Sequence, residues 1–375
     1  MIYNKSCLIR KILLIFILIV LVLNIPLLIY KRKLRKKVGI ISLRHEVNIG
    51  NNLIKYAISI IIKQLGYTPY IVGTHWRNFN ISFLNKTTNL VIIKNNFSEI
   101  KRNDYDVLIV NSDQTWRRFD KDFYDYGFLK FAERWKIKKF AYGASLGYDY
   151  WELTQKDEEV AKKLIANFSD ISVREEGAVK LIEEHFGRTP TFVLDPTLLI
   201  DKEYYLNIIK DYKGSRIMNK KYIFVYTISN PIEVFEAVKK ASLILNYETY
   251  YLRLNNQATI ENFLYYLLKS DCVITNSFHG TVFSIIFNKP FITIYNKLNA
   301  RARYLSLGNL FGISDRLFEN KEKPDFNQLI NPLKINLTLL IFITKIVVKY
   351  LIMIKGLEQL RLKSINFIKK NLESI

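Results

Sequence analysis

The pattern of apolar and polar positions predicts strands that alternate with helices along most of the chain. Short continuous apolar runs, such as Val107 to Val110, are typical of buried strands, and segments with helical apolar spacing, such as Leu53 to Leu65, are typical of helices. Alternation of the two kinds of element indicates a parallel sheet covered by helices. The expected fold class is therefore α/β.

A polar stretch from Asp211 to Lys221 interrupts this series and is expected to be a linker. A second α/β series follows it, beginning with the strand Tyr222 to Thr227. A chain of 375 residues has room for about two domains. We predict a membrane anchor with a basic flank at 1–37, an N-terminal α/β domain at 38–210, a C-terminal α/β domain at 211–330 and a C-terminal helical segment at 331–375.

The two ends of the chain carry long apolar segments. Ile12 to Tyr30 contains no charged residue, has the length of a transmembrane helix and is followed by the basic run Lys31 to Lys37. A cleaved signal peptide is the rival interpretation, but no small-residue cleavage site follows the apolar run. Leu333 to Ile354 is also apolar but is broken by lysines, which favours an interfacial or buried helix, and Leu357 to Leu372 is typical of an amphipathic helix. For the N-terminal segment, the basic run that follows it and the positive-inside rule predict a membrane-anchored protein whose folded part lies on the cytoplasmic face.

Most of the net charge of +22 is concentrated at the two ends of the chain, beside the apolar segments. Residues 1–37 contain nine lysines and arginines and no acidic residue, so much of the excess lies beside an apolar segment. This placement favours an anionic membrane surface as partner over nucleic acid. Cys7 and Cys272 are too few for a disulfide framework or a cysteine-based zinc site, and we expect no metal and no cofactor.

One stretch, Asp271 to Phe291, predicts a strand from Cys272 to Thr275, a tight polar turn, a helix from Thr281 to Phe287 and then a second strand that begins at Phe291. The turn, Asn276 to Gly280, falls at the carboxyl end of a parallel strand and at a helix N-terminus. Ligands bind at such strand ends in open α/β sheets, and backbone N–H groups attract anions there. His279 lies in this turn, and the sequence leaves open whether it is a structural residue or part of a site.

Polar residues also follow the strands predicted in the first domain. Two such α/β domains would enclose a cleft between their strand ends. The candidates at these positions are Asn48, Asn51, Asp113, Gln114, Ser145 and Arg174. Each has a plainer interpretation: the asparagines mark a turn, Asp113 caps a helix or forms an Asx-turn, and Arg174 is a surface or salt-bridged residue beside Glu175. Asp195 followed by Pro196 is predicted to be a structural strand end rather than a site.

Six motifs in one order resemble the polysaccharide pyruvyl transferase family over about residues 37–320. In the order of the sequence, the motifs are Gly-Ile-Ile-Ser-Leu with Asn-Ile-Gly-Asn-Asn, Asn-Ser-Asp-Gln-Thr-Trp, Tyr-Gly-Ala-Ser-Leu-Gly, Ile-Ser-Val-Arg-Glu-Glu, Leu-Asp-Pro-Thr-Leu-Leu and Thr-Asn-Ser-Phe-His-Gly-Thr-Val-Phe-Ser. The resemblance implies two Rossmann-like domains in a glycosyltransferase-B-like arrangement. It also implies transfer of a pyruvyl group, as a ketal, from phosphoenolpyruvate to a sugar of a cell-surface polysaccharide or its lipid-linked precursor.

The resemblance assigns expected roles to the candidate residues. His279 matches the family's catalytic histidine, and phosphoenolpyruvate is a co-substrate rather than a cofactor. The expected donor-binding residues are Arg174, Ser277, Phe278 and Gly280. The remaining candidates, Asn48, Asn51, Asp113, Gln114 and Ser145, are expected from their positions after strands to bind the sugar or glycan acceptor or to line the cleft.

The sequence departs from the family at one important position. Many members carry Arg-Leu-His where this chain has Ser277, Phe278 and His279, so one expected donor-binding arginine is missing. Arg44, Arg301 and Arg303 are the candidates to replace it. Two further hypotheses therefore stay open: a glycosyltransferase of similar fold that uses a nucleotide sugar, and a non-catalytic envelope-assembly protein.

Overall fold

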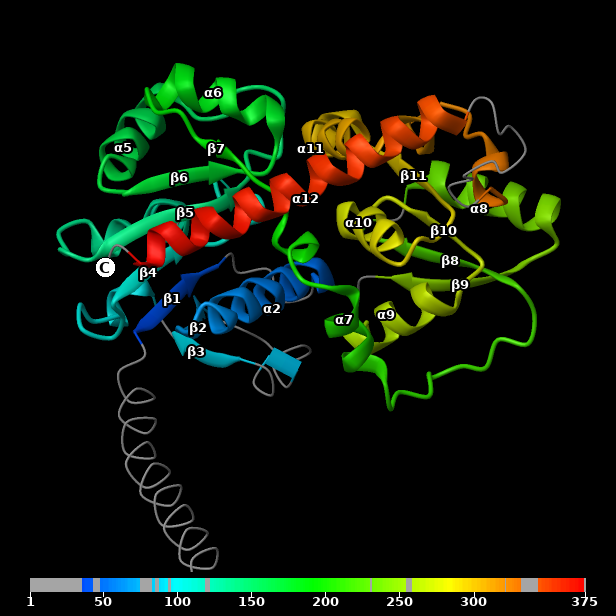
Figure 1. Ribbon diagram of the computed structural model, residues 1–375, viewed down its shortest axis with the longest axis horizontal. Coiled ribbons are helices and arrows are strands. Elements are labelled where there is room, and N and C mark those ends of the chain that lie inside the picture. The colour runs from blue at the N-terminus through cyan, green and yellow to red at the C-terminus, as the bar shows by residue number, and fades with distance from the viewer. Residues whose placement is uncertain are drawn as a thin grey trace, which may run out of the picture.

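The computed structural model describes residues 36–42, 48–74, 83–84, 88–93, 96–118, 122–229, 231–253, 258–320, 322–331 and 343–373. These residues form two parallel β-sheets with helices packed against them, one sheet in each half of the chain (Figure 1). The strands Val107–Val110, Tyr222–Thr227 and Cys272–Thr275 are buried along their whole length, as expected for the interior of parallel sheets. The predicted α/β fold with two parallel sheets is therefore confirmed.

The first sheet has seven strands in the order β3-β2-β1-β4-β5-β6-β7. The chain runs outward from β1 to β3 and then returns to place β4 on the other side of β1, so the order reverses between β1 and β4. The loops on the two sides of such a reversal diverge and leave room for a ligand. The strands are β1 (Lys37–Ile41), β2 (Thr68–Thr74), β3 (Asn89–Ile93), β4 (Val107–Val110), β5 (Lys138–Ala144), β6 (Asp170–Val173) and β7 (Thr191–Phe192).

The second sheet has five strands in the order β12-β11-β10-β8-β9 and reverses between β8 and β10. The turn that follows β10, which contains His279, therefore lies at the reversal point of its own sheet. The strands are β8 (Tyr222–Thr227), β9 (Glu248–Arg253), β10 (Cys272–Thr275), β11 (Phe291–Tyr295) and β12 (Leu317–Glu319).

Helices connect and cover both sheets (Figure 1). In the first half they are α2 (Ile49–Gln64), η1 (Phe97–Glu99), α4 (Phe123–Phe128), η2 (Lys130–Ala132), α5 (Gln155–Ile165), α6 (Glu176–Phe186), η3 (Pro196–Leu198) and α7 (Lys202–Ile209). In the second half they are α8 (Ile232–Leu245), α9 (Ile260–Lys269), α10 (Phe278–Ile286), α11 (Lys297–Phe311), η4 (Ser314–Arg316), η5 (Phe326–Leu329) and α12 (Ile343–Glu373). Helix α7 joins the two halves of the chain, because it contacts α9 and its Tyr204 accepts a hydrogen bond from Gln64 in α2. The predicted domain boundary at residue 210 stays a prediction.

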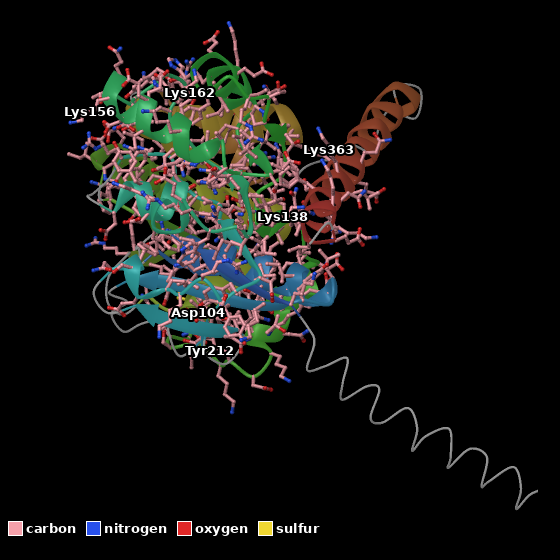
Figure 2. The ribbon with its side chains drawn as sticks, turned by 90° about the vertical axis from the view of Figure 1, so that its left-hand side faces the viewer. Asp104, Lys138, Lys156, Lys162, Tyr212 and Lys363 are labelled. Atoms are coloured by element: carbon pink, nitrogen blue, oxygen red, sulfur yellow. The ribbon has the colours of Figure 1, made fainter. Side chains whose placement is uncertain are left out.

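The helix α12 runs across both halves of the molecule (Figure 1). The Ser364 hydroxyl accepts a hydrogen bond from the backbone N–H of Leu194 at 3.0 Å, and the Phe367 ring lies 6.1 Å from the Phe140 ring of the first sheet. Figure 2 shows Lys363, an exposed residue, on this helix. The sequence predicted two separate helical segments here, whereas the chain forms one helix of 31 residues from Ile343 onward.

The predicted fold class is corrected in one respect. No helix in the described part of the chain is both long and apolar enough to cross a membrane, so the predicted N-terminal transmembrane helix is not supported. The segment predicted to form it, Ile12 to Tyr30, lies outside the described residues. The location at a cytoplasmic membrane face depended on that segment and stays a sequence-based expectation.

Candidate functional site

The turn after β10 is tight because three small polar residues close it. The backbone N–H of Ser277 donates to the Thr275 hydroxyl at 3.0 Å, and the Ser277 hydroxyl accepts from the N–H of Gly280 at 3.3 Å. Ser277 is therefore the N-cap of α10, and the helix begins at Phe278, earlier than the predicted Thr281. His279 consequently lies in the first turn of a helix, where the backbone N–H groups carry a partial positive charge.

The first turn of α2 meets this turn from the other half of the molecule. The Asn48 side chain accepts a hydrogen bond from the N–H of Gly50 at 2.9 Å, so α2 begins at Ile49 rather than at the predicted Leu53. A Cβ atom placed on Gly50 would lie 2.0 Å from Nδ1 of His279. Gly50 thus lets the imidazole approach the helix backbone, and two helix N-termini converge on His279.

Arg174, at the end of β6, is the centre of a buried network of ionic contacts. Its guanidinium donates to the carboxylates of Asp195 at 2.6 Å and Asp113 at 2.8 Å, and to the Ser112 hydroxyl at 3.2 Å. Only 1% of its side chain is exposed. Burial alone would lower the pKa of Arg174. The three carboxylates beside it outweigh burial and raise this pKa above its ordinary value; they belong to Asp195, Asp113 and Glu175. The salt-bridged interpretation of Arg174 therefore fits its contacts, and few of its donors remain for a ligand.

Asp195 connects this network to His279. Its Oδ2 atom lies 3.8 Å from Nε2 of His279, while its Oδ1 atom accepts from the N–H and the hydroxyl of Thr197 at 3.0 and 2.6 Å. Burial would raise the pKa of Asp195, but its contacts with His279 and Arg174 outweigh burial and hold the pKa well below its usual range. Asp195 is therefore an ionised carboxylate beside the candidate catalytic histidine. The sequence had predicted only a structural strand end there.

Asp113 follows β4 with an unusual backbone conformation. Its φ is 97°, a region that residues with a side chain rarely adopt. The backbone is held by the N–H of Ser145, which donates to the Asp113 carbonyl at 3.1 Å, and by a bridge to Ala144. Backbone strain of this kind persists where surrounding contacts fix it, and it is found most often at functional sites.

Several polar atoms around these residues are buried without a hydrogen-bond partner. His279 touches Gly50, the neighbour of Asn51, and Arg174 bonds to Ser112, the neighbour of Asn111, so the unpaired groups lie near one another. Buried polar groups in native proteins are nearly always paired, so a cluster of exceptions indicates a place for a polar ligand. The unpaired atoms are both amide atoms of Asn51 and of Asn111, both carboxylate oxygens of Glu175, Nε of Arg174, Nε of Arg303 and Nε2 of His279.

Glu175 enters the sequence-based expectations only as a neighbour of Arg174. Its side chain is fully buried, and Nε of Arg174 lies 3.5 Å from its Oε1 atom. Burial raises the pKa of Glu175 above its ordinary value, and the nearby charge of Arg174 offsets only part of this rise. Two charged residues in succession after a β-strand give no sequence signal that one of them will be a fully buried carboxylate.

The remaining predicted site residues differ in what they contact. Phe278 lies between the charged groups: its ring makes an edge contact with His279, and the guanidinium carbons of Arg174 and Arg303 lie 4.9 and 5.2 Å from its centroid. Gln114 is engaged by Arg117 at 2.8 Å, and the Ser145 hydroxyl accepts from the N–H of Gly147 at 3.1 Å. Asn48 and Ser277 are helix caps, and Gly280 packs so closely on Thr275 that a Cβ would lie 2.3 Å from its hydroxyl oxygen.

The site can therefore hold a proton at His279 and attract negative charge at two helix N-termini. No group of histidine, cysteine, aspartate or glutamate side chains in the described ranges is arranged to hold a metal ion. The described residues offer acid–base chemistry at His279 and electrostatic attraction at the two helix N-termini.

Comparison with known proteins gives one family match. A model described as polysaccharide pyruvyl transferase matches residues 48–297. No curated protein sequence matches the chain.

Solved structures are similar to the chain at low sequence identity. Arabidopsis thaliana UGT89C1, complexed with UDP-L-rhamnose, is 9% identical, with 90% of this chain and 98% of that chain covered and a TM-score of 0.53. UDP-GlcNAc 2-epimerase from Methanocaldococcus jannaschii is 13% identical, with 80% and 93% covered and a TM-score of 0.49. A glycosyltransferase from Rickettsia africae ESF-5 is 13% identical, with 91% and 97% covered and a TM-score of 0.47. The first similarity supports a common fold and confirms the predicted glycosyltransferase-B-like arrangement of two Rossmann-like domains.

Proposed function

The chain belongs to the polysaccharide pyruvyl transferase family and is a transferase, and on that premise we propose that its donor is phosphoenolpyruvate. The acceptor is a sugar of a cell-surface polysaccharide or of its lipid-linked precursor, and the product is a pyruvyl ketal. The observation that carries the proposal is the position of His279: a buried imidazole with an unpaired Nε2, in the first turn of α10, beside the Asp195 carboxylate.

Ketal formation from phosphoenolpyruvate requires proton transfers that an imidazole can serve. A proton adds to the terminal enol carbon, which becomes the methyl group, and a sugar hydroxyl oxygen bonds to the adjacent carbon. The bond from that carbon to the phosphate oxygen then breaks, and a second hydroxyl of the sugar closes the ketal. One proton is consumed at carbon, and of the two released from the hydroxyls, one restores the acid and one leaves with phosphate.

His279 is the group we assign to these transfers. The ionised Asp195 carboxylate, 3.8 Å from Nε2, stabilises the imidazolium that donates the proton. Phosphate and carboxylate are attracted by the partial positive charge at the N-terminus of α10. To the unpaired amide of Asn51 we assign a hydrogen bond with a hydroxyl of the acceptor.

The experiment is phosphate release from phosphoenolpyruvate in the presence of a glycan acceptor. We expect His279→Ala to lower the turnover number by about 10²- to 10⁴-fold, which is the usual contribution of a general acid or base. The matched control is His185→Ala, because His185 lies away from the site, stacked on Trp151 and bonded to Glu158 at 2.9 Å. Wild-type turnover in His279→Ala would contradict the mechanism.

A nucleotide-sugar donor is the second candidate, and one observation favours it. Three buried carboxylates surround Arg174, and Ser277 stands where the family's arginine is expected, so the site offers little positive charge to a phosphoenolpyruvate trianion. UGT89C1, which shares the fold, was solved with UDP-L-rhamnose. Thermal shifts with phosphoenolpyruvate and with UDP-sugars, measured side by side, discriminate the two donors, because only a bound ligand stabilises the folded state.

A further inference from the structure

Arg303, in α11, is a buried guanidinium with too few partners. Only 12% of its side chain is exposed, and its Nε has no hydrogen-bond partner. An ionic contact joins its Nη1 to Oδ1 of Asp113 at 3.9 Å, which is beyond hydrogen-bonding distance. Arg174 reaches the same oxygen at 2.8 Å, so the charge of Asp113 is already shared.

The surroundings of Arg303 leave its charge poorly compensated. Burial and the nearby Arg174 both lower the pKa of Arg303 below its ordinary value, with burial the larger cause. The carboxylates of Asp113 and Glu175 offset part of this lowering, and the guanidinium carbon of Arg303 lies 5.2 Å from the centroid of the Phe278 ring. A buried cation without hydrogen bonds is costly, and an anion that fills its free donors removes much of that cost.

The neighbours of Arg303 in α11 fix its position against the site. The Tyr304 hydroxyl donates to the carbonyl of Asn276, in the turn before His279, at 2.9 Å. The Ser306 hydroxyl accepts from the N–H of Glu176 in α6 at 3.0 Å, which ties the helix to the first half of the molecule. Arg303 is therefore held beside the turn that precedes α10, rather than swinging freely at the surface.

The other arginines that the sequence offered have different positions. Arg301 is more exposed and is already paired with Glu319 at 3.1 Å and Asp149 at 3.3 Å. Arg174 is engaged by Asp113 and Asp195. Arg44 lies outside the described residues.

We propose that Arg303 binds the anionic end of the donor and supplies, from α11, the positive charge that the missing arginine at Ser277 would have supplied. This assignment rests on the proposed function, since it names a residue for phosphoenolpyruvate. The planar guanidinium suits a carboxylate or phosphate, to which it can donate two parallel hydrogen bonds. The N-terminus of α10 adds its partial positive charge on the same anion.

The test compares two variants of Arg303 with Arg301→Ala, a nearby arginine of the same helix. Phosphoenolpyruvate affinity is measured by calorimetry, and KM is measured separately for phosphoenolpyruvate and for the acceptor. We expect Arg303→Ala to weaken phosphoenolpyruvate binding by about 10- to 100-fold, with the acceptor KM nearly unchanged. Arg303→Lys keeps the charge but loses the paired donors, so we expect an intermediate loss, while Arg301→Ala binds like the wild type.

The outcomes separate this assignment from the function on which it rests. If the wild type neither binds phosphoenolpyruvate nor releases phosphate from it, the proposed function and the assignment both fail. If the wild type uses phosphoenolpyruvate and Arg303→Ala binds it equally well, the assignment alone is refuted. A melting temperature for each variant shows whether a loss of phosphoenolpyruvate binding is due to unfolding. If Arg303→Ala unfolds, the affinity of Arg303→Lys tests the assignment instead. Partial restoration of Arg303→Ala by added guanidinium ion would support direct binding over a structural role.

Discussion

The contact between Gly50 and His279 gives a sharp test of how the two halves of the molecule meet. Gly50→Ala places a methyl group where the imidazole lies, with the new Cβ 2.0 Å from Nδ1 of His279. Real Cβ atoms essentially never approach another atom closer than 3.0 Å, so the ring or the helix must retreat. The required shift is about 1 Å, and a displacement of that size at a catalytic group can cost about 10²-fold in rate.

The stability of Gly50→Ala follows from two opposed effects. Alanine is favoured over glycine in a helix by roughly 1 kcal/mol, whereas overpacking a well-filled site costs about 1–3 kcal/mol. The matched control is Gly177→Ala, because Gly177 is also the second residue of its helix but has no atom within 4 Å of the new Cβ. We therefore expect Gly177→Ala to gain stability and Gly50→Ala to lie about 1–3 kcal/mol below it.

The assay is urea unfolding of the wild type and both variants, with the turnover number measured on the same preparations. If Gly50→Ala gains as much stability as Gly177→Ala and keeps the wild-type turnover number, the imidazole does not lie against Gly50 in the active enzyme. That result would refute the arrangement in which α2 and α10 meet at His279.

Three further predictions concern the buried polar network. Arg174→Ala leaves the carboxylates of Asp113 and Asp195 buried without their partner, and we expect a loss of about 3–5 kcal/mol in urea unfolding; a loss below 1 kcal/mol would contradict the network. Burial raises the folded-state pKa of Glu175 above its ordinary 4.5, so its contribution to stability is fully present below that pH and is lost as the pH rises through the folded-state pKa. Glu175→Gln should therefore stabilise the protein at neutral pH and flatten its stability between acid and neutral pH, and an unchanged pH profile would count against this. Ser277→Ala removes the cap of α10 and should cost about 1 kcal/mol in thermal unfolding without raising the KM for phosphoenolpyruvate, whereas a raised KM would indicate that Ser277 binds the donor.

The strands of the fold were accessible from the sequence because they are buried on both faces. Val107–Val110, Tyr222–Thr227 and Cys272–Thr275 are continuous apolar runs, and the structure gives them the predicted bounds. Helix starts were less accessible, because a cap depends on which side chain bonds the first free N–H group. Two asparagines after Gly50 are equally good caps by type, yet it is Asn48 that bonds the helix.

The candidate site was only partly accessible for a different reason. His279 could be singled out because a strand, a turn and a helix follow one another locally. Asp195 could not, because a sequence does not show that the ends of β7 and β10 come together from two different sheets. For Arg174 the residue type was informative but the role was not, since the same guanidinium either binds a ligand or is neutralised by carboxylates, and only the fold determines which.

The position of α12 has a consequence for how the chain folds during its synthesis. The buried side chains of Phe367, Ile368 and Leu372 belong to the same apolar cluster as Phe140 and Tyr142 of β5. The hydrogen bond from Leu194 to Ser364 joins residues 170 positions apart. The core of the first half therefore cannot be completed until residues 364–372 have been made, by which time the whole second sheet has left the ribosome. Until then β5 exposes an apolar surface that is open to chaperones or to misassociation.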